Sequence, residues 1–452
     1  MNSMYFVRIE AIRMENFKSV SKGEVYFNEQ KSLTRGEIKD DEFSSILGIY
    51  GQNGSGKTTI IECLKIIQQL FSMKFLSNNL INCFRYDEDN IKLETDFYLF
   101  NDNEKFYFTY QIIFKKEDSK IFIDEEKLSY FDLLKKKKTI NIYQYKNKQI
   151  NKSFLNLFTK EEQAIINYLI AETNYLDLNN DRLYSTLFNP KLFKIFKNNQ
   201  GFADFFKFLD TFYNFANTKL FIYPISYFAS DELGGIRYKI NDSEYQTLNF
   251  NETSISNNYF DSLEHSINQI NKVLPHIIPN LEIVILKTNS EQESKYLNTT
   301  NFVLMSKKED KLTLLNNESN GIKKIISILN GIIEVFNHEG YFLAIDELDS
   351  GLYEYLLGEL IYSFENFSSG QLLFTSHNLR ALEKMNYKNV FFTTVSPNKR
   401  FTKLSNIRET NNLRDVYYKK ILNAPKEDIK LYDNIRSDKL IKSLLLNEDK
   451  NE

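Results

Sequence analysis

The sequence predicts an α/β fold, in which a head domain is split along the chain by an inserted, mostly helical lobe. Two observations predict the sheet of the head. A glycine-rich loop follows a short apolar run at 45–50, and a pair of carboxylates ends another apolar run at 341–345. Long helical patterns fill the chain between these runs and predict the lobe. Short apolar runs of this kind are typical of buried parallel strands.

The glycine-rich loop, Gly51 to Thr58, has the spacing G-x-x-x-x-G-K-[ST] of a phosphate-binding P-loop. Its glycines let successive backbone N–H groups point at one phosphate chain, and the helix predicted at 59–70 adds its N-terminal dipole. Lys57 is expected to reach the β- and γ-phosphates, and the Thr58 hydroxyl to bind Mg²⁺. The nucleotide-binding residues predicted here are Gly51, Gln52, Asn53, Gly54, Ser55, Gly56, Lys57, Thr58 and Thr59.

The remaining patterns divide the chain into four parts. Around the P-loop we expect a polar loop at 30–44, two antiparallel strands within 5–27, a hairpin at 91–100 and 105–114, and a strand at 120–128. Helical patterns follow at 161–172, 202–215 and 257–274, and strand patterns return at 281–286 and 302–315. The predicted parts are residues 1–129 (head, with the P-loop), 130–275 (helical insertion), 276–424 (second part of the head) and 425–452 (a charged tail with a helix pattern at 437–446).

Two apolar runs in the second part of the head end in polar residues. The run at 341–345 ends in Asp346 and Glu347. A buried strand here would deliver Asp346 to the shell of a Mg²⁺ ion and would let Glu347 polarise an attacking water. The run at 371–374 leads to His377. A lone histidine is ordinarily a surface residue, but its place after such a run favours a functional role.

Ser319 precedes a helix pattern that runs to about Val335, and we predict it as the N-cap of that helix. Gly321 follows in the first turn, and the pair lies upstream of Asp346 in the chain. An ordinary capped helix is the alternative interpretation of this segment.

In this order, the motifs resemble those of ABC-type ATPases of the SMC/RecF/OLD lineage. The chain resembles more closely the compact AAA-type ATP-binding proteins of bacterial anti-phage and abortive-infection operons. The resemblance covers residues 4–128 and 281–408, and besides the P-loop it is carried by 16–19, 346–349 and 375–378. It implies a P-loop ABC-type ATPase head with ATP and Mg²⁺ as cofactors.

The resemblance also implies a role for each candidate residue. Glu347 and His377 would be catalytic, with His377 as the γ-phosphate sensor, and Thr58 and Asp346 would bind the metal. Ser319 and Gly321 match the signature motif, which binds the γ-phosphate of ATP held by another subunit.

Some positions depart from the pattern. Asn320 stands where the signature often has Gly, and Tyr353 stands where many relatives have His. No glutamine matches the Q-loop clearly, and Gln111, in a strand pattern, is only a candidate. No sustained heptads predict coiled-coil arms. Residues 124–127 faintly resemble a nuclease motif, and we favour a solvated charged turn there.

The composition limits the class of protein. Basic and acidic side chains nearly cancel, 57 against 60, so no global positive field predicts binding to nucleic acid. Cys63 and Cys83 are too few for a disulfide framework or a zinc site. No apolar run approaches the length of a membrane span. We therefore expect a soluble, cytoplasmic protein without a membrane partner.

The predicted function is slow ATP hydrolysis that gates a separately encoded effector, a nuclease, in bacterial anti-phage defence. We expect a homodimer or larger homo-oligomer, because the P-loop and the signature of an ABC-type subunit lie on opposite sides. Two alternatives stay open, a RecF-like DNA repair ATPase that clamps DNA directly and a nucleotide-gated scaffold with little turnover. The basic run Lys135 to Lys138 fits either a weak nucleic-acid contact or an exposed loop.

Overall fold

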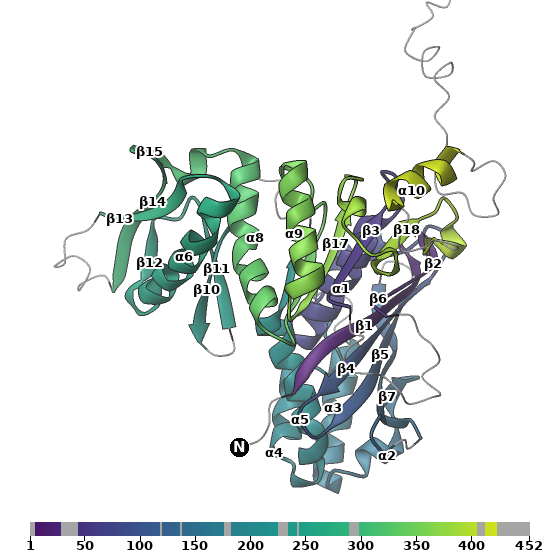
Figure 1. Cartoon of the computed structure of the whole chain (residues 1–452). Helices are drawn as coiled ribbons and strands as arrows, with labels where there is room; N and C mark the ends of the chain where they lie inside the picture. Colours follow the sequence, from purple (N-terminus) through teal and green to yellow (C-terminus); the bar gives the residue numbers. More distant parts are fainter. Residues whose placement is uncertain are drawn as a thin grey trace, which may run out of the picture.

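The computed structural model describes residues 5–28, 44–117, 120–135, 138–175, 182–224, 234–241, 244–288, 298–404 and 412–422. These residues form a central parallel sheet, a long antiparallel sheet that we call the outer sheet, and a smaller side body (Figure 1). The α/β class predicted from the sequence is confirmed.

The central sheet has six strands in the order β19-β18-β3-β17-β16-β9, and all neighbours pair in parallel except β19 with β18. The strands are β3 (Ile46–Tyr50), β9 (Leu220–Tyr223), β16 (Phe342–Ile345), β17 (Gln371–Ser376), β18 (Val390–Thr393) and β19 (Phe401–Thr402). Every residue of β3, β16 and β17 is buried, as expected for strands covered on both faces. The P-loop strand and the carboxylate strand therefore end at the same edge, with β17 between them.

Helices cover both faces of the central sheet. They are α1 (Lys57–Phe71), α8 (Asn320–Asn337), α9 (Glu354–Phe367) and α10 (Leu413–Leu422). Leu47 and Ile49 of β3 belong to a core shared with α1, whereas Ile46 and Tyr50 belong to a core shared with α8 and α9. This division follows from the alternating directions of side chains along a strand.

The outer sheet has seven antiparallel strands in the order β2-β1-β4-β5-β6-β7-β8. Their bounds are β1 (Phe6–Phe17), β2 (Val20–Tyr26), β4 (Asn90–Phe100), β5 (Lys105–Glu117), β6 (Lys120–Asp132), β7 (Ile140–Lys146) and β8 (Gln149–Ile150). The predicted pair of N-terminal strands is confirmed as β1 and β2, and the predicted hairpin as β4 and β5.

Helix α1 lies between the two sheets and contacts both. Its last residue, Phe71, packs against Phe97 of β4, Tyr110 of β5 and two further aromatic rings. The side chain of Gln371 on β17 bonds to both backbone groups of Ile9 on β1, each at 2.9 Å. The sheets are therefore joined by polar contacts as well as by a shared core.

Among the described residues, the side body combines helix α6 with short antiparallel strands. Its elements are β10 (Gly235–Asn241), β11 (Glu244–Asn249), β12 (Ser254–Ser256), α6 (Asn257–Ile277), β13 (Leu281–Lys287), β14 (Thr299–Lys308) and β15 (Lys311–Leu314). Its core continues into α8 through Ile325, Ile326 and Leu329. Helix α8 thus packs against the central sheet on one side and the side body on the other. None of the helices in the described residues combines the length and apolar character that crossing a membrane requires.

The residues predicted as one helical insertion, 130–275, are divided among all three parts of the structure. Four helices pack with the outer sheet, namely α2 (Lys152–Leu155), α3 (Lys160–Tyr175), α4 (Pro190–Asn198) and α5 (Ala203–Asn214). Strand β9 pairs in parallel with β16 of the central sheet, and α6 belongs to the side body. The prediction needs this correction because strands as short as β9 carry no readable period, and a π-helix (Phe215–Lys219) leads directly into β9. The predicted loop at 30–44 and the predicted helix at 437–446 lie almost wholly outside the described residues.

Candidate functional site

The P-loop connects β3 to α1 at the carboxyl edge of the central sheet. Gly54 and Gly56 have φ values of 75° and 90°, a backbone region that favours glycine, and Gly56 is the N-cap residue of α1. A Cβ atom on Gly51 would lie 1.7 Å from the Thr393 hydroxyl, which also hydrogen-bonds to Ser55 Oγ at 2.6 Å. Thr393, at the end of β18, therefore packs against the P-loop at Gly51 and hydrogen-bonds to it at Ser55. The sequence did not predict this role.

The other predicted P-loop residues line the same turn. Asn53 and Gly54 are exposed at its tip, Ser55 and Thr59 are buried, and Gln52 and Thr58 are half-buried. The backbone N–H of Ser55 donates to Gln52 O at 3.3 Å. The loop thus presents its exposed tip on the surface and anchors its second half in the core.

Lys57, the first residue of α1, is buried and its ammonium group faces the loop. Nζ donates to Gly51 O at 2.9 Å and to Gln52 O at 3.0 Å, and it lies 3.4 Å from His377 Nδ1. Burial lowers the pKa of Lys57, whereas the nearby carboxylates act in the opposite direction. A cation held in this way suits a phosphate ligand.

The acidic loop, which we define as Asp346 to Gly351, follows β16. Asp346 Oδ1 accepts a hydrogen bond from the Thr375 hydroxyl at 2.5 Å, and that hydroxyl accepts one from the backbone N–H of Glu347 at 2.8 Å. Asp346 is only 1% exposed, yet its Oδ2 has no hydrogen-bond partner among the described residues. Buried oxygens are normally paired, so a free carboxylate oxygen here fits the hard oxygen donors that Mg²⁺ prefers.

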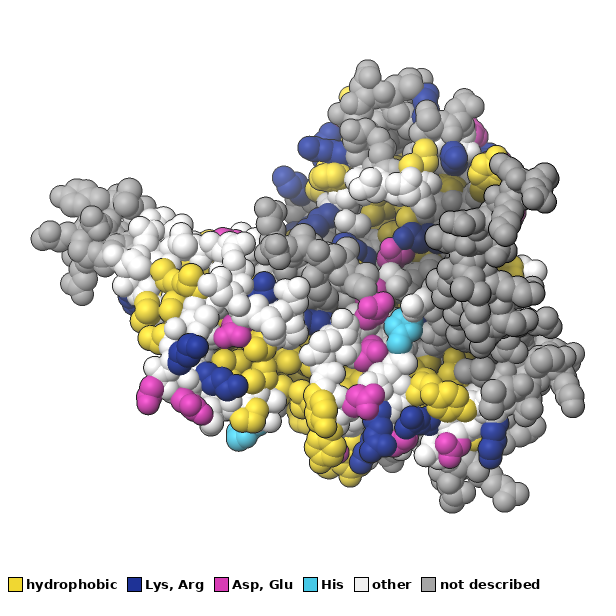
Figure 2. Space-filling model, turned by 90° about the horizontal axis from the view of Figure 1, so that it is seen from above, with side chains coloured by type: hydrophobic (Ala, Val, Ile, Leu, Met, Phe, Trp, Pro, Cys, Tyr) yellow, Lys and Arg dark blue, Asp and Glu magenta, His cyan; other side chains and the backbone are white. Residues whose placement is uncertain are grey.

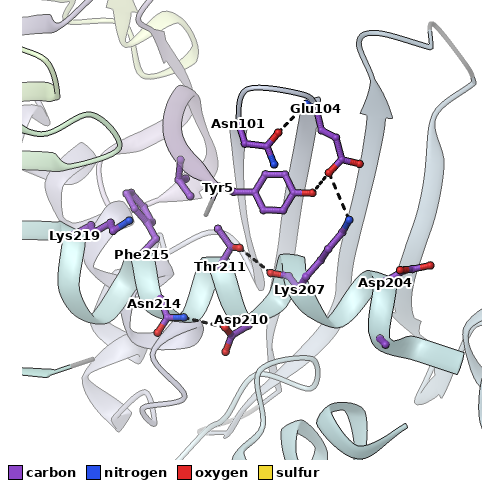
Figure 3. A pocket seen from close by; sticks show the side chains of 12 residues that line it. Tyr5, Asn101, Glu104, Asp204, Lys207, Asp210, Thr211, Asn214, Phe215 and Lys219 are labelled. Carbon is purple, nitrogen blue, oxygen red and sulfur yellow. Dashed lines mark hydrogen bonds and ion pairs between the residues drawn. The ribbon is translucent and has the colours of Figure 1, made fainter. Parts of the chain in front are cut away.

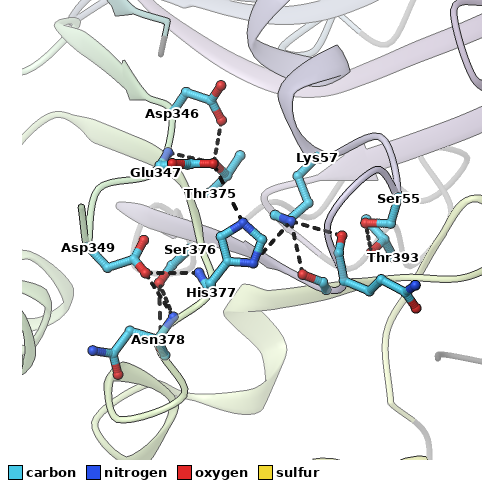
Figure 4. A network of polar contacts seen from close by, with 12 residues as sticks. Ser55, Lys57, Asp346, Glu347, Asp349, Thr375, Ser376, His377, Asn378 and Thr393 are labelled. Atoms are coloured by element: carbon cyan, nitrogen blue, oxygen red, sulfur yellow. Dashed lines mark hydrogen bonds and ion pairs between the residues drawn. The ribbon is translucent and has the colours of Figure 1, made fainter. Parts of the chain in front are cut away.

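His377 lies between the P-loop lysine and the second carboxylate (Figure 4). Its Nε2 is 3.6 Å from Glu347 Oε1, and its backbone N–H donates to Asp349 Oδ2 at 3.1 Å. The position of β17 between β3 and β16 produces this arrangement. Seen from above, Asp, Glu and His side chains gather near the middle of the molecule (Figure 2).

Ser319 and Gly321 lie at the start of α8, and Gly321 packs against the acidic loop. Ser319 is exposed and caps the helix by accepting from Ile322 N at 3.4 Å. A Cβ atom on Gly321 would lie 2.9 Å from Gly351 O. The predicted N-cap is confirmed, and the segment is packed tightly beside the loop that carries Glu347.

Lys324 is a site residue that the sequence analysis missed. It is 5% exposed, and its ammonium group donates to the backbone carbonyls of Glu347 and Ser350. Burial lowers the pKa of Lys324 to about 8, although the carboxylates of the acidic loop oppose the shift. The sequence does indicate that this position is buried, because Lys324 lies four residues before Ile328, at the spacing of the apolar face of α8.

Three further interpretations of the sequence can be placed in the structure. Gln111 lies in β5 of the outer sheet, opposite Glu94 and Lys127, and not at the carboxyl edge of the central sheet. Residues 124–127 are part of strand β6, so the predicted solvated turn is wrong. Glu126 is fully buried, and it accepts hydrogen bonds from hydroxyl groups on Tyr110, Ser185 and Thr186.

The basic run is only partly within the described residues, which include Lys135 and Lys138. Lys135 is exposed and lies 3.4 Å from Asp132. This ion pair offsets part of the positive charge of Lys135.

A cavity of about 730 Å³ lies between β1, the β4–β5 turn and α5 (Figure 3). Its polar side chains largely satisfy one another. Lys207 lies 3.6 Å from Glu104, and Asn214 donates to Asp210 at 3.0 Å. The mixed and paired charges select no ligand class.

The parallel central sheet, the P-loop and the carboxylates beside it are the features of a P-loop ATPase domain. They define the class of this protein. The family described as "AAA domain, putative AbiEii toxin, Type IV TA system" matches residues 46–383, which include the P-loop, Ser319, the acidic loop and His377. Because the match spans most of the chain, the protein belongs to this family. The resemblance predicted from the motifs is thereby confirmed.

Comparison with solved structures finds SMC heads and RecF. An SMC head bound to the C-winged helix domain of ScpA has 13% sequence identity and a TM-score of 0.44, with 88% of this chain and 98% of that chain covered. The recombination mediator RecF of the RecFOR pathway has 14% identity and a TM-score of 0.40, covering 90% and 100%. The SMC head domain from Thermotoga maritima has 12% identity and a TM-score of 0.34, covering 88% and 99%. Among curated protein sequences, none matches.

Proposed function

We propose that the protein binds ATP with Mg²⁺, hydrolyses it slowly, and uses the nucleotide state to gate a partner effector. The observation that carries this proposal is the convergence of Lys57, His377 and the Asp346–Glu347 pair at one edge of the central sheet. Bound Mg²⁺ would neutralise phosphate charge as it develops.

Each side chain has a task that its surroundings support. The P-loop N–H groups and Lys57 hold the phosphates, and Thr58 with Asp346 holds the metal. Glu347 polarises the attacking water. His377, which lies 3.6 Å from the Glu347 carboxylate, contacts the γ-phosphate and couples its presence to Glu347. The residues at the start of α8 serve the nucleotide of a second subunit in a head-to-head dimer.

A surface beside the acidic loop supports a protein partner. Helix α9 begins shortly after that loop, and it and its N-cap residue expose several aromatic side chains, namely Tyr353 at the N-cap and Tyr355, Tyr362 and Phe367 in the helix. Exposed aromatic patches are typical of protein interaction sites. We propose a cytoplasmic setting and a nuclease in anti-phage defence as the effector, because the motifs resemble those of ATP-binding proteins from anti-phage operons.

The purified full-length protein tests the proposal. Titration with ATP should show Mg²⁺-dependent binding, and phosphate release should be slow but measurable. Glu347→Gln should keep binding and lose release. If release is absent from the wild type while function persists in cells, the nucleotide-gated scaffold is favoured instead. Tight DNA binding at physiological salt, lost when Lys135 to Lys138 are neutralised, would favour the DNA-clamping alternative.

A further inference from the structure

Lys324 is a buried lysine that the proposed nucleotide chemistry does not use. Its ammonium group donates to the carbonyl oxygens of Glu347 and Ser350, the latter at 2.9 Å. Both acceptors are backbone atoms of the acidic loop. The lysine therefore helps to fix the path of the main chain in this loop.

Glu347 depends on such contacts because its backbone has a φ of 47°. Residues other than glycine avoid this region unless the surrounding structure enforces it. The backbone N–H of Glu347 donates to the Thr375 hydroxyl. Its carbonyl oxygen accepts from the Lys324 ammonium group and from the N–H of Ser350, the latter at 3.0 Å. Loss of Lys324 would release one of the contacts on the carbonyl side.

A second contact joins the same two segments one helical turn away. A Cβ atom on Gly321 would lie 2.9 Å from Gly351 O, and one on Gly351 would lie 2.9 Å from Gly321 Cα. The start of α8 and the acidic loop thus meet at the glycine pair and at Lys324. A shift of one segment must therefore move the other.

We propose that Lys324 is a positioning residue that couples the N-terminal end of α8 to Glu347. This inference rests on the proposed function, in which Ser319 and Gly321 face the nucleotide of a second subunit. Contact with that nucleotide displaces the start of α8, and Lys324 passes the displacement to Glu347 of its own chain. ATP held by one subunit in this way controls water activation in the other.

A matched pair of variants tests the proposal in the full-length protein. Lys324→Met removes the donors and keeps the chain length, whereas Lys323→Met removes a neighbouring ammonium group that bonds to Asn316 O at 3.2 Å. We expect Lys324→Met to lower kcat at least tenfold with KM within about twofold of the wild type. Lys323→Met should stay near the wild type, and Lys324→Arg, which keeps donors, should retain more activity than the methionine variant.

Hydrogen exchange supplies a measurement that does not need turnover. Amides of residues 346–352 should exchange at least tenfold faster in Lys324→Met than in Lys323→Met, at similar melting temperatures. Should Lys324→Met not fold, Lys324→Gln takes its place in both measurements. Equal turnover and equal exchange in the two variants would overturn the role of Lys324 and leave ATP hydrolysis intact. A wild type without turnover would instead overturn the hydrolysis, and exchange would still decide whether Lys324 fixes the loop.

Discussion

The Thr375 hydroxyl donates to the carboxylate of Asp346 at 2.5 Å, so strand β17 orients the side chain that strand β16 delivers. The same oxygen accepts the backbone N–H of Glu347 at 2.8 Å. One threonine therefore fixes both carboxylate residues, and it leaves the second oxygen of Asp346 free of other hydrogen bonds among the described residues.

Thr375→Val should impair Mg²⁺-dependent turnover, because it removes both hydrogen bonds while keeping the shape of the side chain. A hydrogen bond to a charged group contributes roughly 1.5–3 kcal/mol, which corresponds to a loss of roughly tenfold or more. A magnesium titration of phosphate release measures the effect. Thr375→Ser keeps the hydroxyl and should retain most of the activity, and equal losses in the two variants would contradict the proposed role.

Lys57→Ala should weaken ATP binding by at least about 100-fold, because a buried cation and its phosphate contacts are lost. Titration with a fluorescent ATP analogue measures the affinity. Lys323→Met, which also removes one positive charge, serves as the control and should bind normally. Near-normal affinity of Lys57→Ala would refute the assignment of the P-loop.

Mixing two inactive variants tests the shared site. Lys57→Ala chains and Ser319→Arg chains should regain partial ATPase activity together, because one site of a mixed dimer keeps Lys57 from one chain and Ser319 from the other. Phosphate release is measured against each variant alone. Mixed dimers that form but stay inactive would argue against sharing, or for obligatory coupling of both sites.

The buried carboxyl group of Glu10 should make the free energy of unfolding depend on pH. Burial raises its pKa to about 7, although a hydrogen bond from Asn28 at 2.8 Å acts against the shift. The folded state thus holds a proton that the unfolded state loses near pH 4.5, so stability falls as pH rises from about 4.5 to 7. The loss amounts to about 3 kcal/mol.

Glu10→Gln should remove this dependence and be more stable than the wild type at pH 8. Urea unfolding at pH 5 and pH 8 measures the difference. Glu15→Gln changes an exposed carboxylate on the same strand and should keep the wild-type slope. A slope in Glu10→Gln equal to that of the wild type would show that another group causes the dependence.

The sequence was informative wherever a short local pattern specified an element. The P-loop spacing between an apolar run and a helix predicted β3 and α1, and the run ending at Asp346 predicted β16. The cap at Ser319 was equally local. These predictions needed only residues within one strand or one turn.

Contacts between distant segments could not be read in this way. Thr375 and Thr393 bond to residues in the loops that follow other strands, and Lys324 bonds to a residue 23 positions further along the chain. The sequence did not predict strand β9 for a related reason, because four apolar residues after a helix fit either a helix or a strand. Pairing with β16, not local propensity, makes it a strand.

The order of strands in the central sheet has a consequence for synthesis on the ribosome. The neighbours of β3 are β17 and β18, which emerge only after residues 371–376 and 390–393 have been translated. The outer sheet, in contrast, is built from residues 6–150 mostly through hairpins between consecutive strands, and can assemble early. A nascent chain therefore carries its P-loop sequence long before the sheet can hold it in shape. Incomplete chains would lack the nucleotide site, and a gate that depends on ATP would be confined to finished molecules.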